Sequence, residues 1–329
     1  VSGCKMAPKY TRPEAPIPAE WPTGPAYEEP AAVTEAPAPV DLPWREFFTD
    51  EKLQQVIEMA LRNNRDLRVA ASNVELARAL YRVQRDELYP SIHATAGGAR
   101  QRASVDLTSP GQDRTTERYS IDLGVLAWEI DFFGRLRSLK DRALREYLAT
   151  DQARRSTQIM LIGSVANAYL ALAADREALA LAESTFQTQK AAYDLVQRQY
   201  EIGIATELDL RRAQMPVDTA RADMAHYTQL VAQDENALSL LAGSGVSQSL
   251  LPDHLAGIEP LAEISYGLSS EVLLSRPDII AAEHQLQGAY ANIGAARAAF
   301  FPSISLTGLF GTASDELSGL FDSGTGTWS

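Results

Sequence analysis

The residues that most often carry chemistry are few in this chain, and they do not cluster. His93, His226, His254 and His284 are scattered and there is a single cysteine, so no metal-ligand spacing is present. The sequence contains no glycine-rich phosphate loop and no serine nucleophile elbow. We therefore expect no metal site, no bound cofactor and no catalytic residue, and we do not expect an enzyme.

The only cysteine, Cys4, has a setting that indicates covalent lipid attachment. It follows Val1-Ser2-Gly3, and an aliphatic residue, small residues and then cysteine resemble the lipobox of a bacterial lipoprotein signal peptide. On this interpretation Cys4 becomes the lipidated N-terminus. By analogy with bacterial lipoproteins, Lys5 in place of aspartate permits export to the outer membrane. The alternative is a free cysteine in a ragged terminus.

Net charge and proline content limit the possible partners and the structure of the N-terminal region. A net charge of −13 argues against nucleic acid as a partner, because phosphate binding requires a basic surface. Residues 5–43 hold ten of the 17 prolines, which predicts an extended, polyproline-like tether that takes no part in a packed core.

The longest regular element is predicted from Arg135 to Ile202. These 68 residues contain no proline and only one glycine, Gly163. As one helix they would extend about 100 Å. The most apolar stretch, 160–174, is interrupted by Ser, Asn and Tyr, so we predict no transmembrane helix there. Dense alanine favours packing in a bundle or a wall of helices.

A tight turn is predicted between this helix and a shorter returning one. Gly203 suits the left-handed position that ends a helix. Thr206 then caps the helix 207–242, with Asp209 three residues later as an acidic variant of the capping box. Pro216 is expected to kink the returning helix.

Upstream of the long helix, the periodicity changes from helical to alternating. Helices are predicted over 50–62 and 66–88, where Pro90 stops the second. Alternation over 92–98 and again after a polar loop predicts a hairpin of membrane length. Four apolar residues are expected on its lipid face: Tyr119, Ile121, Leu123 and Val125. A soluble hairpin would show the same alternation.

An internal repeat with an offset of 212 residues decides the predicted architecture. Asp66 aligns with Asp278, and Pro90-Ser91-Ile92 aligns with Pro302-Ser303-Ile304. The chain is thus two tandem copies of helix, hairpin, long helix, turn and half-length helix, the second copy incomplete. We expect the partner of its first strand to lie beyond Ser329. Because open sheet edges are not viable in lipid, several chains must share one barrel.

Five segments carry a resemblance to a known family: Trp44-Arg-Glu-Phe-Phe48, Asn63-Asn-Arg-Asp-Leu-Arg-Val-Ala70, Trp128-Glu-Ile-Asp-Phe-Phe-Gly-Arg-Leu-Arg137, Arg276-Pro-Asp278 and Gly294-Ala-Ala-Arg-Ala-Ala-Phe-Phe-Pro-Ser303. On these segments the chain resembles the outer-membrane channels of tripartite efflux pumps, the TolC/OprM-like family, in its lipoprotein (NodT-type) branch.

The resemblance implies a mainly α fold with membrane β structure. It implies a homotrimer with one shared twelve-stranded β-barrel, four strands per chain, above a periplasmic α-barrel of long helical hairpins. It also implies two protein partners, a periplasmic adaptor (membrane fusion protein) at the helix tips and an inner-membrane transporter that drives export. Gly203, Thr206 and Asp209 match the family's first tip and are candidates for adaptor docking and tip closure. The alternative for Asp209 is plain helix capping.

The predicted organisation has seven segments: 1–43, lipidated tether; 44–88, first helices of repeat 1; 89–131, its membrane hairpin; 132–242, its long helix, tip and returning helix; 243–266, equatorial connector; 267–300, first helix of repeat 2; and 301–329, its first strand and loop.

The predicted function is a passive exit duct of a tripartite, RND-type efflux pump in the bacterial outer membrane, conducting drugs or other small molecules. Within the same family, metal-ion or protein export are alternatives, the first of which scattered methionines support only slightly. Outside the family, the alternative is a periplasmic coiled-coil scaffold without a pore. The alternation over 119–125 argues against that scaffold.

Overall fold

The computed structural model describes residues 6–14, 42–262 and 270–329, which fall into two compact units. The strand unit holds the described residues among 1–14, 75–149 and 282–329, including all four strands. The helical unit holds the described residues among 15–74 and 150–281. Three helices contribute residues to both units: α3 (Arg65–Asp86), α4 (Arg135–Glu201) and α6 (Pro277–Ala298).

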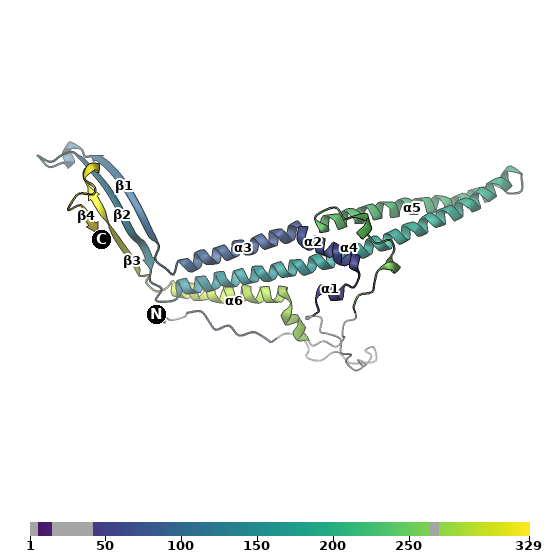
Figure 1. Ribbon diagram of the computed structural model, residues 1–329, viewed down its shortest axis with the longest axis horizontal. Helices are drawn as coiled ribbons and strands as arrows, with labels where there is room; N and C mark the ends of the chain where they lie inside the picture. Colours follow the sequence, from purple (N-terminus) through teal and green to yellow (C-terminus); the bar gives the residue numbers. More distant parts are fainter. Residues whose placement is uncertain (1–5, 15–41, 263–269) are drawn as a thin grey trace. The chain divides into compact units, whose positions relative to one another are not determined.

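Long helices dominate the described chain (Figure 1). Their bounds are Trp44–Phe47 for α1, Glu51–Asn63 for α2, Arg65–Asp86 for α3, Arg135–Glu201 for α4, Glu207–Ala242 for α5 and Pro277–Ala298 for α6. The long helix predicted over 135–202 is confirmed, because α4 is one 67-residue helix. The returning helix α5 remains helical through Pro216, and the kink stays a prediction.

Helices α3 and α6 show the tandem repeat directly. Both have 22 residues, and both their first and last residues are related by the predicted offset of 212. Each has an aspartate in its first turn, Asp66 and Asp278. A strand follows each helix at the corresponding place in the chain: β1 (Ile92–Arg102) after α3 and β3 (Ser305–Ser314) after α6.

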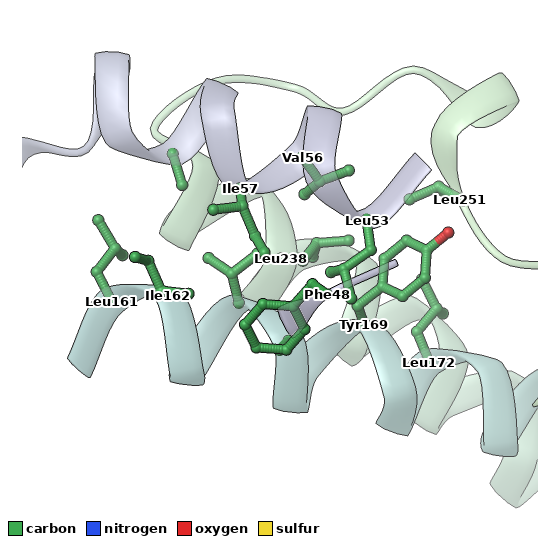
Figure 2. Packing of buried hydrophobic residues seen from close by; sticks show 13 residues of the cluster. Phe48, Leu53, Val56, Ile57, Leu161, Ile162, Tyr169, Leu172, Leu238 and Leu251 are labelled. Atoms are coloured by element: carbon green, nitrogen blue, oxygen red, sulfur yellow. The ribbon is translucent and has the colours of Figure 1, made fainter. Parts of the chain in front are cut away.

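The helical unit is built around one hydrophobic cluster in which α2 and its flanking residues pack on α4 and α5 (Figure 2). Asp50 caps α2 by accepting a hydrogen bond from the backbone N–H of Leu53 at 2.8 Å. The cap sets the start of α2 next to Leu53, the first residue of this helix in the cluster. The cluster contains Phe48, Leu53, Val56, Ile57, Ala60, Leu161, Ile162, Val165, Ala166, Tyr169, Leu172, Leu238 and Leu251.

The apolar middle of α4 is accounted for by this cluster. By length and composition alone, part of α4 is apolar enough to cross a membrane. Val165, Tyr169 and Leu172 in this part are essentially inaccessible to solvent and pack in the cluster. Burial raises the pKa of the Tyr169 phenol well above its ordinary value. These three residues therefore contribute to the hydrophobic core of the helical unit.

The N-terminal segment differs from the predicted tether where it is described. Residues 6–14 contain no helix or strand, yet they lie against α6. The Tyr10 ring packs edge-on against Tyr290 at 5.6 Å, and Arg12 forms an ion pair with Glu283. An aromatic ring and a guanidinium supply contacts that the proline content alone did not indicate. Residues 15–41 of the predicted tether lie outside the described residues.

The strands form one antiparallel sheet in the order β1-β2-β3-β4. Their bounds are Ile92–Arg102, Thr115–Glu129, Ser305–Ser314 and Gly326–Trp328. The prediction that the partner of β3 lies beyond Ser329 is wrong for its first residues, because Gly326–Trp328 already pair with β3. The reason is that β2 begins at Thr115 and not at Arg118, where the sequence predicted its start, so the corresponding strand of the second repeat begins earlier too.

Candidate functional site: the strand sheet and the α4–α5 turn

The pairing register determines which side chains share a face of the sheet. Between β1 and β2, Ile92 lies opposite Val125 and Gly98 lies opposite Tyr119. Between β2 and β3, Leu123 lies opposite Phe310. Because directly paired residues point to the same face, each pairing extends the alternation of one strand to its neighbour.

One face of the sheet is mainly apolar, with Thr312 and Ser314 of β3 as polar exceptions. The four residues predicted for a lipid face, Tyr119, Ile121, Leu123 and Val125, lie on it together. The register adds Ile92, Ala94, Ala96, Trp128, Leu306, Phe310 and Trp328. The paired rings of Phe310 and Trp328 are 71% and 85% exposed, so the apolar surface points away from the protein. Such a surface indicates contact with lipid or with another chain.

A β-bulge keeps Trp128 on this face. Between Val125 and Trp128, β2 has one residue more than the facing part of β3, where Gly308 and Leu306 are the partners. Strict alternation would have turned Trp128 to the opposite side. The indole Nε1–H instead donates to the carbonyl of Leu88 at the end of α3, at 3.2 Å. Sequence periodicity did not reveal the bulge.

The opposite face carries small and polar side chains, apart from Leu309. It includes His93, Thr95, Gly97, Ser120, Asp122, Gly124, Thr307, Gly311 and Ala313. The sheet therefore has one apolar and one polar surface. This is the pattern of a strand wall between lipid and a water-filled interior.

Two ion pairs connect the end of β2 to the first turn of α4. The guanidinium of Arg135 donates to Glu129, with Nε 2.9 Å from Oε1. Asp131 Oδ2 accepts from both the backbone N–H and the Nε of Arg137, each at 3.0 Å. Gly134, at φ +78°, makes the change of direction between strand and helix.

Asp131 is held ionised by these contacts. Burial alone would raise the pKa of its carboxyl group, but the hydrogen bonds from Arg137 outweigh burial and lower that pKa below its usual value. Next to it, the rings of Phe133 and Phe301 stack at 4.5 Å, which joins the entry of α4 to the segment before β3. In the sequence, these residues stand out only as members of the family motifs at 128–137 and 294–303.

The α4–α5 turn has the predicted geometry. Gly203 has φ +79°, and the N–H groups of Gly203 and Ile204 donate to the carbonyls of Tyr200 and Gln199 at 2.9 and 2.8 Å. This is a Schellman ending. The side chain of Ile204 is 73% exposed, so the turn is stabilised by backbone hydrogen bonds and not by burial.

Thr206 and Asp209 form a complete capping box. The Asp209 N–H donates to Thr206 Oγ1 at 3.2 Å, and the Thr206 N–H donates to Asp209 Oδ2 at 3.0 Å. The hydrogen bonds from Thr206 lower the pKa of the Asp209 carboxyl group. The three candidate turn residues are thus brought together, and their docking role stays a prediction.

Two further predictions concern lipid attachment at Cys4 and metal binding. Cys4 lies outside the described residues. Within the described parts of the chain, no three His, Cys, Asp or Glu side chains are grouped as metal ligands would be.

Comparison with known proteins places these features in a family. Residues 56–244 and 268–329 match the family described as outer membrane efflux protein. The chain belongs to this family. A probable efflux pump outer membrane protein, TtgC of Pseudomonas putida, is 48% identical over 328 residues, covering 100% of this chain and 67% of TtgC.

Solved structures agree with that membership. The open-state MtrE outer membrane channel of Neisseria gonorrhoeae has a TM-score of 0.84 and 39% identity, over 99% of this chain and 71% of MtrE. A membrane protein from Pseudomonas aeruginosa gives a TM-score of 0.85 and 39% identity, over 99% and 72%. The chain spans about two thirds of these relatives, in keeping with a partial second repeat.

Family membership indicates where in the cell the protein lies. The protein is an outer-membrane efflux channel component with its helical part in the periplasm. That the apolar face is the lipid side of the channel wall, and the polar face its interior, stays a prediction.

Proposed function

We propose that the protein is the outer-membrane exit duct of an RND-type tripartite pump, passively conducting drugs or other small molecules from the periplasm to the outside. The observation that carries this proposal is the two-faced sheet connected to the 67-residue helix α4. Transport of this kind requires a pore and no chemical step, so no residue is assigned a catalytic role.

The proposed assembly is a homotrimer in which each chain contributes four strands to a twelve-stranded barrel. In the described sheet, β1 is an edge strand, and its unpaired N–H and C=O groups need partners in lipid. A neighbouring copy supplies these partners most simply, because closed rings of identical chains satisfy every edge.

The proposed contact with a periplasmic adaptor is the α4–α5 turn. Gly203, Thr206 and Asp209 give this turn a stable, exposed backbone, as a docking surface requires. An inner-membrane transporter then drives export through the adaptor.

We further propose that Cys4 carries a covalent lipid, which the mass of the mature N-terminal peptide would reveal.

The first test places a charge on each face of β2. Val125→Arg puts a guanidinium on the apolar face and is expected to destabilise the membrane-inserted form, by about 2–4 kcal/mol if the side chain were at mid-membrane and by less because Val125 lies toward the end of the hairpin, opposite Ile92. Ser120→Arg is the matched control on the polar face and should leave assembly intact. The readout is the amount of heat-resistant oligomer in isolated outer membranes. Equal assembly of both variants would contradict the lipid-facing assignment.

The second test is the mass of the intact protein in mild detergent, measured by light scattering after size exclusion. A trimer is the expected result. A stable monomer or dimer would exclude the shared barrel and leave the long helices as a scaffold without a pore.

A further inference from the structure

A cavity of about 520 Å³ lies in the strand unit between the N-terminal segment, α4 and α6. Its volume is within the range of pockets that bind small molecules. Six lining residues matter to its chemistry: Lys9, Tyr10, Leu144, Arg145, Gln287 and Tyr290. None of them belongs to the sheet or to the α4–α5 turn.

The N-terminal segment forms one wall of this cavity because it is fastened along α6. Arg12 Nε donates to Glu283 Oε1 at 3.0 Å, and the Tyr10 hydroxyl donates to the same oxygen at 3.2 Å. Further along α6, Gly294 allows the segment to lie directly on the helix, since a Cβ there would be 2.8 Å from Ala7. The wall is therefore continuous from Ala7 to Arg12.

Two cations line the cavity without a partner. Within the described part of the chain, Lys9 and Arg145 make no hydrogen bond or ion pair, although acidic residues outnumber basic ones by 43 to 30. The lining carboxylate of Asp141 is 3.6 Å from the Nζ of Lys140. Arg145 is half-buried and Lys9 is exposed, so both side chains are available to a ligand in the cavity. An oxyanion is the ligand that a guanidinium binds best.

Gln287 adds an unpaired acceptor. Its Nε2 donates to Glu283 Oε1 at 3.3 Å, whereas its Oε1 is buried without any hydrogen-bond donor. A buried carbonyl oxygen in that state favours a ligand hydroxyl. Between these polar groups, the rings of Tyr10 and Tyr290 offer apolar surface.

We propose that this cavity binds an amphiphilic oxyanion. Its phosphate or carboxylate head contacts Arg145 and Lys9, a hydroxyl donates to Gln287 Oε1, and an apolar body lies against the packed rings of Tyr10 and Tyr290. The site is not repeated on α3, because the residues equivalent to Gln287 and Tyr290 there are Glu75 and Arg78. The proposal does not depend on the channel function.

The test uses the intact protein in phosphatidylcholine nanodiscs and octyl phosphate as the probe, with titration calorimetry as the readout. Octanol lacks the charge and inorganic phosphate lacks the apolar body, so both should bind at least roughly ten-fold more weakly. Arg145→Gln should weaken octyl phosphate binding by roughly 10- to 100-fold. Arg142→Gln, an exposed arginine that donates to Asn292, is the control and should stay within about two-fold.

Two outcomes would overturn the site: octanol binding as tightly as octyl phosphate, or Arg145→Gln binding it unchanged. If Arg145→Gln does not assemble, ionic strength provides the test on the unaltered protein, where added salt must weaken octyl phosphate binding. Phosphatidylglycerol added to the nanodiscs separates the two sources of the ligand. Competition with the probe identifies a membrane lipid, and no competition identifies a free amphiphile.

Discussion

Asp131 shows how a single carboxylate fastens a strand to a helix. Its side chain is only 9% exposed, and Oδ2 accepts two hydrogen bonds from Arg137 in the first turn of α4. A negative charge at this end of a helix is also favoured by the helix dipole. The contact therefore holds the sheet and the longest helix in register at their junction.

Replacement of Asp131 by Asn keeps the shape and removes the charge. We expect a loss of about 2 kcal/mol of stability at neutral pH, because a charge-assisted hydrogen bond is weakened inside the protein. The folded-state pKa of Asp131 lies below its unfolded value of about 3.9, so its contribution is full above that pH and is lost as pH falls through the folded-state pKa.

Thermal unfolding of the purified oligomer measures this effect. The difference between Asp131→Asn and the unaltered protein should shrink below about pH 4. Asp86→Asn, on an exposed aspartate at the end of α3, is the control. A gap between Asp131→Asn and the unaltered protein that stays constant with pH would show that the carboxylate charge is not the cause.

Two glycines on the polar face of the sheet allow a matched comparison. A Cβ on Gly124 would lie 2.1 Å from the carbonyl oxygen of Gly308 in the adjacent strand, whereas a Cβ on Gly97 would meet nothing within 4 Å. Gly124→Ala should therefore disturb the β2–β3 pairing and lower the thermal midpoint of the oligomer. Gly97→Ala should leave that midpoint unchanged. Equal effects would contradict the close approach of these strands.

At the scale of elements, α3 has an apolar row that no described residue covers. Val69, Leu76, Leu80 and Val83 are 58–63% exposed. Their spacing of seven, four and three residues matches the seam by which helices pack on one another. Such a row indicates a neighbouring helix, and in the proposed trimer that helix belongs to another chain.

A charge in this row should weaken the assembly. Leu76→Lys introduces an ammonium group into the proposed helix contact, where burying it unpaired costs several kcal/mol. Glu75→Lys, at an exposed position about 100° around the helix from Leu76 and outside the row, is the control. Analytical ultracentrifugation in detergent should show dissociation for Leu76→Lys only. A stable trimer in both variants would place the seam elsewhere.

At the scale of the whole molecule, the net charge and the polar face of the sheet predict which ions the channel prefers. The chain carries a net charge of −13, and Asp122 lies on the face assigned to the channel interior. Acidic side chains in a narrow aqueous passage raise the local concentration of cations. The channel should therefore prefer cations over anions.

The reversal potential across a planar bilayer, measured in a salt gradient, checks this preference. Asp122→Lys should shift it toward anions, and the shift should diminish at high salt, where charges are screened. Asp106→Lys, in the loop between β1 and β2, is the comparison. An unchanged potential in Asp122→Lys would place that side chain outside the ion pathway.

The sequence predicted those features that depend on near neighbours in the chain. The Thr206–Asp209 capping box and the ends of α4 were predicted to within a residue, because caps and breakers act over a few positions. That Tyr119, Ile121, Leu123 and Val125 share one face of β2 followed from alternation alone. The 212-residue repeat added the correspondence of α3 with α6.

The tertiary structure decided what depends on residues far apart in the chain. The bulge that turns Trp128 to the apolar face exists only relative to β3, nearly 180 residues later. The docking of residues 6–14 on α6 joins the two ends of the sequence, and the cavity beneath them depends on that contact. Local periodicity determines helix and strand, whereas strand register, segment docking and cavities come from pairing across distance, which no local pattern records.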